Sequence, residues 1–181
     1  LAGACLVLLG FHTVVADTAA FWQQQLGPLM EQELEPRVVN NVLPVLSGYW
    51  MLGLWALVVG SLLLGRWWQA LLYNPGGFGA EFQALRLDWR LAGAALALML
   101  GAAATGPGLV HDLALVAAGG FTVQALAVAH AVRATAGWHW AAMVPVYLLL
   151  PLLFQLYALV AIADSWLDIR RRQLDRRGDN E

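Results

Sequence analysis

The stretch RWWQALLYNPGGFGAEFQALRLDWR, residues 66–90, divides the chain into two apolar parts. It combines aromatic side chains, three arginines, a Pro-Gly-Gly turn and a short segment with the spacing of an amphipathic helix. The sequence on either side consists of long apolar runs with few charges. This contrast predicts helices that are soluble in hydrocarbon, interrupted by one polar segment that lies at a membrane interface.

The composition of the whole chain supports a membrane protein. The 181 residues are 60% hydrophobic and only 12% charged, and the mean hydropathy is +0.64. Ordinary globular domains have about 25% charged residues, so this chain has about half the charge needed to cover a water-facing surface. We therefore expect an all-α, polytopic helical membrane protein that forms a single transmembrane domain over residues 1–181.

Four apolar segments are predicted to be full transmembrane helices, each near the 20 residues that a span needs. They are Val42–Gly65, Leu91–Thr105 with part of the four preceding residues, Leu109–Thr135 and Trp138–Trp166. Leu1–Val15 is shorter, and we interpret it as a transmembrane helix cut at its start. We therefore expect the chain to be part of a longer protein.

Two further segments are predicted to be amphipathic helices at the interface. One lies within residues 66–90, and the other is Asp17–Asn41, whose apolar residues recur at steps of three and four. Gly27-Pro28 is expected to break the second helix and Glu35-Pro36 to end it.

Small residues and prolines predict how the spans pack. Gly48, Gly53 and Gly60 are expected to let a neighbouring helix approach closely, with the last two on a shared face because they are seven residues apart. Pro145 and Pro151 predict a kink in the last span, where neighbours or side chains must satisfy the freed carbonyl groups.

The tail, residues 166–181, holds five of the ten arginines. By the positive-inside rule it is expected to be cytoplasmic, where anionic lipid attracts it, and we favour this over nucleic-acid binding. Counting spans back then places residues 66–90 and their arginines outside, against the same rule. A different number of crossings between residues 91 and 135, for instance one re-entrant segment, removes the conflict, so the topology stays open.

No catalytic chemistry is predicted. The chain has no lysine and one cysteine, and it lacks the HExxH, GxSxG, CxxC, GxGxxG and Walker motifs. We therefore expect no enzyme, no cofactor and no metal site.

Three polar side chains inside predicted spans are candidates for ligand binding: Gln124, His130 and Gln155. Gln124 and His130 are six residues apart on one helix, so they point to different faces and a shared metal site is disfavoured. The alternative is that these groups are hydrogen-bonding glue between helices.

A second candidate set is Arg66, Gly76, Gly77 and Arg86, which are predicted to contact a lipid headgroup or another anion. The turn NPGGFG, residues 74–79, can present backbone N–H groups to an anion. The alternative, which we favour, is a tight turn with glycines at positive φ joining two interfacial helices.

Two blocks carry a resemblance to a known family. GRWWQALLYNPGGFGAEFQALRL, residues 65–87, and DSWLDIRRR, residues 164–172, resemble the C-terminal part of a YybS-like family of predicted multi-pass bacterial inner-membrane proteins with a domain of unknown function. The resemblance implies an inner-membrane location and further helices before residue 1. The family's helical layout is similar to that of substrate-binding membrane subunits of vitamin-type uptake transporters, which need ATPase partners.

Three functions are therefore considered. The first is a non-catalytic, small-molecule-binding or transport-type membrane subunit that contacts membrane lipids and other membrane subunits. The second is a structural or partner-binding membrane protein whose polar groups in the membrane hold helices together. The third is a membrane enzyme acting on a lipid-linked substrate.

Overall fold

The computed structural model describes residues 36–106 and 108–167, with side chains from residue 48 onward, and six isolated positions between residues 17 and 28. All the regular elements in the described residues are helices, with no strand among them, which confirms the all-α class. The predicted cut span Leu1–Val15, most of residues 17–35 and the tail beyond residue 167 lie outside the described residues.

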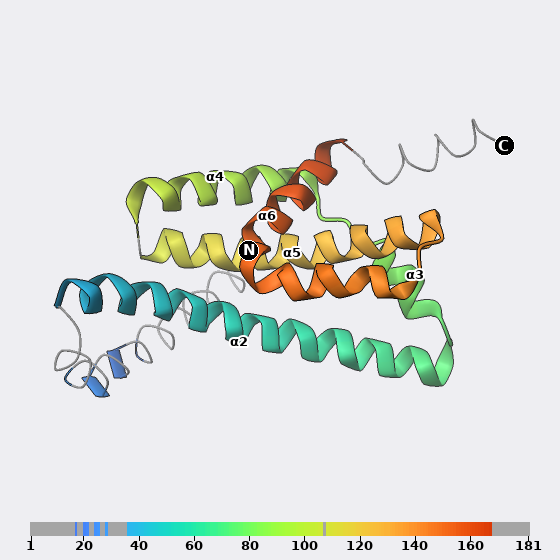
Figure 1. Ribbon diagram of the computed structural model, residues 1–181, viewed down its shortest axis with the longest axis horizontal. Helices are drawn as coiled ribbons and strands as arrows, with labels where there is room; N and C mark the ends of the chain where they lie inside the picture. The colour runs from blue at the N-terminus through green and yellow to red at the C-terminus, as the bar shows by residue number, and fades with distance from the viewer. Residues whose placement is uncertain are drawn as a thin grey trace.

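Five α-helices and one short 3₁₀ helix make up the described part of the chain. They are α2 (Pro36–Tyr73), α3 (Gly77–Gln83), α4 (Trp89–Thr105), α5 (Leu109–Ala136), the 3₁₀ helix η1 (Trp140–Ala142) and α6 (Met143–Leu167). In Figure 1, α4 lies beside the first half of α5, while α2 runs along the length of the bundle.

Three helices are long and apolar enough to cross a membrane: the Gly48–Tyr73 part of α2, α5, and α6 together with η1. The fourth predicted span corresponds to α4, which is apolar but has only 17 residues. At 1.5 Å per residue it is about 25 Å long, shorter than the roughly 30 Å of a bilayer's hydrocarbon core.

Helix α2 differs from the predicted span Val42–Gly65 at both ends. It begins at Pro36, where the sequence predicted a helix end, because proline fits the first turn of a helix and its missing N–H costs nothing there. It then continues through Arg66 to Tyr73, since no glycine or proline interrupts those residues. The break comes at Pro75 and Gly76, and Gly76 has a φ of 86°.

Helix α5 is the centre of the bundle, because it contacts α2, α3, α4 and α6. Within the apolar 18-residue stretch that could span a membrane, 50% of the α5 residues are buried, whereas the buried share is 11% in α2 and 22% in α6. The core around it is built largely from alanines, which let the helix axes approach closely. Its fully buried members are Ala92, Ala95, Leu115, Ala118, Phe121, Ala125, Phe154, Ala158, Ala161 and Ile162.

Two glycines bring α2 and α5 together. A Cβ atom at Gly119 would lie 2.8 Å from the Trp55 ring, and one at Gly48 would lie 2.8 Å from Leu115 Cδ1. The prediction for Gly48 is therefore confirmed. At Gly53 and Gly60, no described residue lies within 4 Å of a Cβ atom, so the described bundle makes no close approach there. Gly53 and Gly60 do share a face of α2, as their seven-residue spacing predicted. This face points away from α5.

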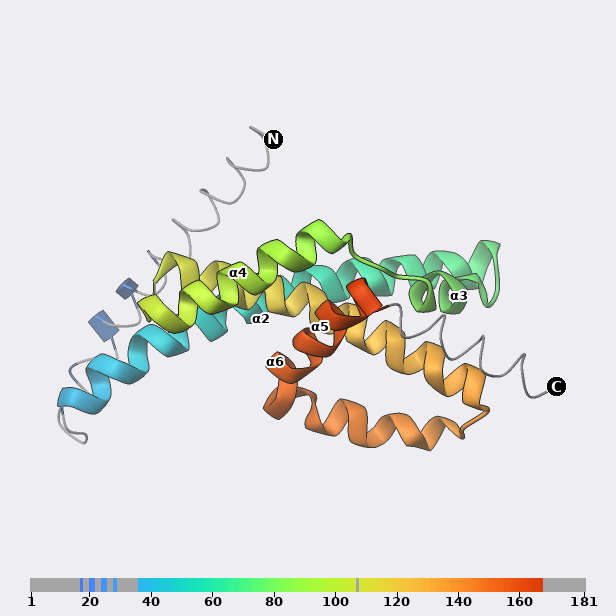
Figure 2. The ribbon, with the colours of Figure 1, turned by 90° about the horizontal axis from the view of Figure 1, so that it is seen from above.

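The predicted kink in the last span is confirmed and is a sharp bend. Leu153, two residues after Pro151, has non-helical angles (φ −114°, ψ 18°). The first leg of α6 runs back from the turn at the end of α5 and diverges from it, and the second leg turns across the bundle toward α4 (Figure 2). Residues 143–152 and 154–167 form legs of about 15 Å and about 21 Å, so neither leg alone crosses a bilayer.

Two hydroxyl groups donate to carbonyl groups on either side of this bend. The Tyr157 hydroxyl donates to the Val146 carbonyl at 3.0 Å. The Thr122 hydroxyl of α5 lies 3.1 Å from the Phe154 carbonyl and 2.8 Å from that of Ala118 in its own helix. The bend is therefore held from within α6 and from the central helix.

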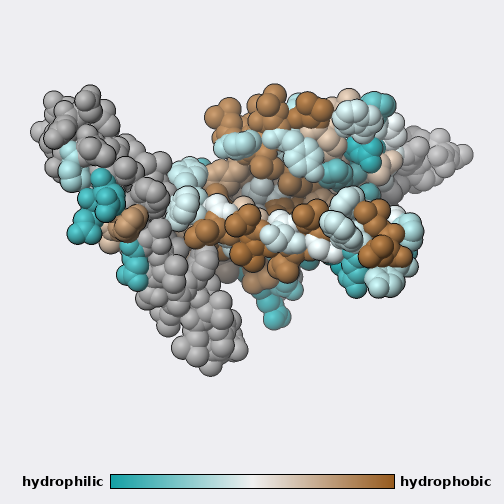
Figure 3. Space-filling view, turned by 90° about the horizontal axis from the view of Figure 1, so that it is seen from below, coloured by the Kyte–Doolittle hydropathy of each residue, from teal (hydrophilic) through white to brown (hydrophobic). Residues whose placement is uncertain are grey.

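The described surface is strongly apolar. Hydrophobic side chains dominate the face shown in Figure 3, and exposed leucines and tryptophans continue along α2 and α6. Trp138, Trp140 and Trp166 are all about half or more exposed, which suits tryptophans at a membrane interface. This surface fits hydrocarbon better than water.

We predict that Gly119→Leu destabilises the protein, because the new side chain collides with the Trp55 ring on α2. Overpacking of this kind costs about 1–3 kcal/mol. The matched control Gly53→Leu adds the same side chain in open space, and leucine's better helix propensity favours it by nearly 1 kcal/mol. Thermal unfolding of the detergent-solubilised protein by circular dichroism measures both. Equal melting temperatures for the two variants would contradict the close approach at Gly119.

Candidate functional site

An extended segment between α3 and α4 brings polar groups to the side of α5. Residues 85–88 are not helical, and Asp88 caps α4 by accepting a hydrogen bond from the Arg90 backbone N–H at 2.7 Å. Because the segment is extended, the backbone N–H of Leu87 has no helical partner. It must therefore find an acceptor elsewhere in the bundle.

The side chain of Gln124 supplies that acceptor. Its Oε1 atom accepts from Leu87 N at 2.7 Å, and its Nε2 atom donates to the Ala161 carbonyl and to Ser165 Oγ, each at 3.1 Å. Gln124 is completely buried. One amide thus ties the α3–α4 segment, α5 and the second leg of α6 together.

Two charged residues belong to the same cluster. Asp164 is 1% exposed, and its Oδ2 atom lies 3.4 Å from Gln124 Nε2. Arg86 donates from Nη2 to the Ser165 carbonyl at 3.2 Å. We call the group formed by Arg86, Leu87, Gln124, Asp164 and Ser165 the polar junction.

The polar junction lies about midway along α5. Gln124 is fifteen residues after the first residue of α5 and twelve before the last. If α5 crosses a bilayer symmetrically, a buried carboxylate and an arginine therefore lie deep in the membrane. Such residues are costly there and usually pair with one another or with backbone carbonyls. Arg86, which is exposed, donates to the Ser165 carbonyl, and the buried Asp164 accepts from the Gln124 amide.

The amide of Gln124, a predicted ligand-binding group, has little hydrogen-bonding capacity left for a ligand. Both amide hydrogens of Nε2 have acceptors within 3.4 Å, and Oε1 accepts one short hydrogen bond. The side chain lines none of the described pockets. Its present role is to fasten helices.

His130 lies elsewhere, on the side of α5 that faces α3. Its Nε2 atom and the Tyr147 hydroxyl share a hydrogen bond of 2.8 Å, which joins α5 to the first leg of α6. The edge of its ring also meets Phe82 of α3, with 5.7 Å between the ring centroids. His130 and Gln124 therefore serve different helix contacts, as their six-residue spacing indicated.

Gln155, the third predicted residue, does line a pocket. This pocket has a volume of about 230 Å³ and lies between α4, α5 and the second leg of α6. The side chains that line it are apolar except for two, Gln155 and His111. We call it the α4–α6 pocket.

Sequence reasoning did not select His111 as a site residue, because His111-Asp112 is a dipeptide that chance supplies easily. Its Nδ1 atom lies 3.4 Å from Asp112 Oδ1, which orients the ring, and its Cε1 atom faces Gly48 of α2. The sequence did hold two signals: His111 is a polar residue in the first turn of a predicted span, and Gln155 follows shortly after Pro151 in another. Only the fold brings the two side chains to one pocket.

The predicted anion site is not gathered in one place. Arg66 forms an ion pair with Glu81 that joins α2 to α3, while Arg86 donates to α6 in the polar junction. Gly76 has the predicted positive φ, and the side chain of Asn74 occupies the space beside Gly77. The turn is thus a chain reversal between two helices.

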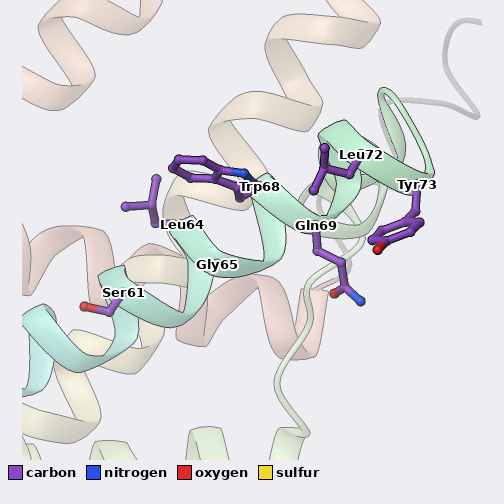
Figure 4. A pocket seen from close by; sticks show the side chains of 7 residues that line it. All are labelled: Ser61, Leu64, Gly65, Trp68, Gln69, Leu72 and Tyr73. Carbon is purple, nitrogen blue, oxygen red and sulfur yellow. The ribbon is translucent and has the colours of Figure 1, made fainter.

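A larger hollow of about 480 Å³ lies along the end of α2. All seven residues that line it belong to this one helix: Ser61, Leu64, Gly65, Trp68, Gln69, Leu72 and Tyr73 (Figure 4). A single helix cannot surround a small molecule, which binds best when most of its surface is buried. This hollow is a surface groove, and the α4–α6 pocket is the better candidate site.

In the described part of the chain, no group of three or more His, Cys, Asp or Glu side chains is arranged to hold a metal. No protein-family model, curated protein or solved structure matches this chain. Functional proposals therefore rest on the geometry of the polar junction and of the α4–α6 pocket.

We predict that Gln124→Leu destabilises the protein, whereas the same change at Gln155 does not. Leucine at position 124 leaves the Leu87 N–H without its acceptor in a buried place, which costs about 1–3 kcal/mol. Gln155 is exposed, so Gln155→Leu should stay within about 0.5 kcal/mol of the parent. Reversible unfolding in mixed micelles measures both free energies. Equal losses for the two variants would contradict the assigned role of the polar junction.

Proposed function

We propose that the protein is a non-catalytic membrane subunit of the transport type, which binds a small molecule in the α4–α6 pocket. The observation that carries this proposal is the position of the pocket. It lies directly after the break in α6, where a polar side chain from each of two helices meets an otherwise apolar space.

Broken helices favour binding sites in membrane transport proteins, because their free backbone ends and polar side chains face a cavity instead of lipid. Gln155 stands two residues after the non-helical Leu153, at the start of the second leg. His111 stands opposite, in the first turns of α5. The pocket has room for roughly eight water molecules, at about 30 Å³ each.

The chemistry of the pocket narrows the ligand. Alanine, leucine and methionine side chains favour a compact apolar body, and the imidazole and the amide each offer a hydrogen bond at its edge. A small, mainly apolar molecule that can hydrogen-bond with the imidazole and the amide fits this lining.

The remaining features of the proposal concern the membrane. The resemblance of this chain to YybS-like proteins supports a location in the bacterial inner membrane. The arginine-rich tail supports a cytoplasmic C-terminus. We further propose that α4 makes a fourth crossing with the help of the adjacent extended residues, since its 17 residues are slightly short.

A second candidate is a partner-binding membrane protein without a ligand. The observation in its favour is that Gln124, the most buried polar side chain of α5, uses its hydrogen bonds to join α5 to other segments of the bundle. The open face of α2 around Gly53 and Gly60 would then meet another membrane subunit. A lipid-directed enzyme has less support, because Arg66 and Arg86 already contact other helices.

We predict that Ala102→Phe, which fills the α4–α6 pocket, and Gln155→Leu each reduce retention of a co-purified small molecule by about tenfold or more. Native mass spectrometry of the purified chain measures the retained mass. The matched controls are Ala97→Phe, on the exposed face of α4, and Gln69→Leu, in the groove on α2.

Both controls should retain the molecule at the parent level. Unchanged retention in Ala102→Phe would contradict the assigned pocket. A parent protein that carries no small molecule when purified from its own membrane would favour the partner-binding candidate.

A further inference from the structure

A second crevice lies between α5 and the two legs of α6, separate from the α4–α6 pocket. Its volume is about 370 Å³, and it is lined almost entirely by apolar side chains. Its polar lining group, the Tyr157 hydroxyl, already donates to the Val146 carbonyl. Whatever fills the crevice must therefore be apolar where it lies inside.

The crevice begins at the turn that joins α5 to α6. Val132, Trp138 and Ala142 line this end, while Ala125 and Tyr157 line the end at the bend. From Val132 to Ala125 it extends about 10 Å along α5, at 1.5 Å per residue. That is about two-thirds of the hydrocarbon depth of one leaflet, which is half of roughly 30 Å.

The outer end of the crevice has the features of a membrane interface. Trp138 and Trp140 are 60% and 66% exposed, as expected of tryptophans at the level of lipid headgroups. Arg133 lies in the last turn of α5, one turn beyond Ala129 of the crevice wall. A cation thus stands beside the mouth.

Arg133 has an unsatisfied hydrogen-bond donor. Its Nε atom is buried and has no hydrogen-bond partner among the described residues. That atom is closed to solvent, but Arg133 as a whole is only partly buried. Its positive charge is therefore open to an anion at the rim, and a planar guanidinium group matches phosphate well. A ligand that fits both parts therefore carries an anionic group at the rim and a hydrocarbon chain inside the crevice.

We propose that this crevice holds an anionic phospholipid, with its phosphate on Arg133 and one acyl chain between α5 and the bent α6. A free phosphate would satisfy the arginine and leave the apolar crevice unfilled. A zwitterionic lipid would fill the crevice but present less net negative charge to the rim. This site is independent of the proposed ligand in the α4–α6 pocket.

Native mass spectrometry tests the proposal, with the full chain in mild detergent titrated with phosphatidylglycerol or phosphatidylcholine of identical acyl chains. We expect about tenfold preferential retention of phosphatidylglycerol, because both lipids carry the phosphate but only phosphatidylcholine adds a cation, which Arg133 repels. Arg133→Gln should abolish the preference and Arg133→Lys should keep part of it. The control Arg90→Gln, which removes a cation stacked on Trp89, should leave it unchanged.

Two further arms locate the acyl chain and the phosphate. Ala129→Phe narrows the crevice and should lower retention of both lipids about equally, while size-exclusion profiles confirm that each variant is folded. Equal retention of the two lipids by the parent, or an unchanged preference in Arg133→Gln, would overturn the proposal. Displacement of phosphatidylglycerol by millimolar inorganic phosphate would instead assign a simple anion site and also overturn it.

Discussion

The hydrogen bonds of Gln124 are the interaction on which the described bundle depends. The α3–α4 segment enters the bundle in extended form, and the second leg of α6 reaches α5 only after a sharp bend. Hydrophobic burial does not fix either arrangement, since lipid tails are as apolar as the helix surfaces. A single amide with 2.7 Å and 3.1 Å contacts to both elements supplies the missing specificity.

The bend of α6 has consequences on both of its sides. On one side, the second leg crosses toward α4 and closes the α4–α6 pocket with Gln155. On the other side, the first leg diverges from α5 and leaves the apolar crevice that leads to the turn near Trp138. One local break, held by Thr122 and Tyr157, thus shapes both candidate binding sites.

Sequence patterns predicted the helical class and the break near Pro151, because composition and proline chemistry act locally. Of the four full spans predicted, three correspond to long apolar helices and the fourth to the shorter α4. The patterns misplaced the end of α2, since RWWQALLY is as good a helix as the residues before it. Gly53 and Gly60 were correctly paired on one face, but spacing cannot say which face meets a neighbour. The polar junction and the shared pocket of His111 and Gln155 depend on contacts between segments that are far apart in the chain. A single sequence does not reveal such contacts.

The backbone amide of Leu87 offers the most direct test of the central claim that one glutamine fastens three elements. Hydrogen exchange of the protein in lipid nanodiscs, resolved for residues 85–88, measures its protection. The account predicts that the Leu87 amide exchanges as slowly as amides inside α5, although it lies outside any helix, and that this protection is lost in Gln124→Leu. Rapid exchange in the parent, or equal protection in the variant, would contradict it.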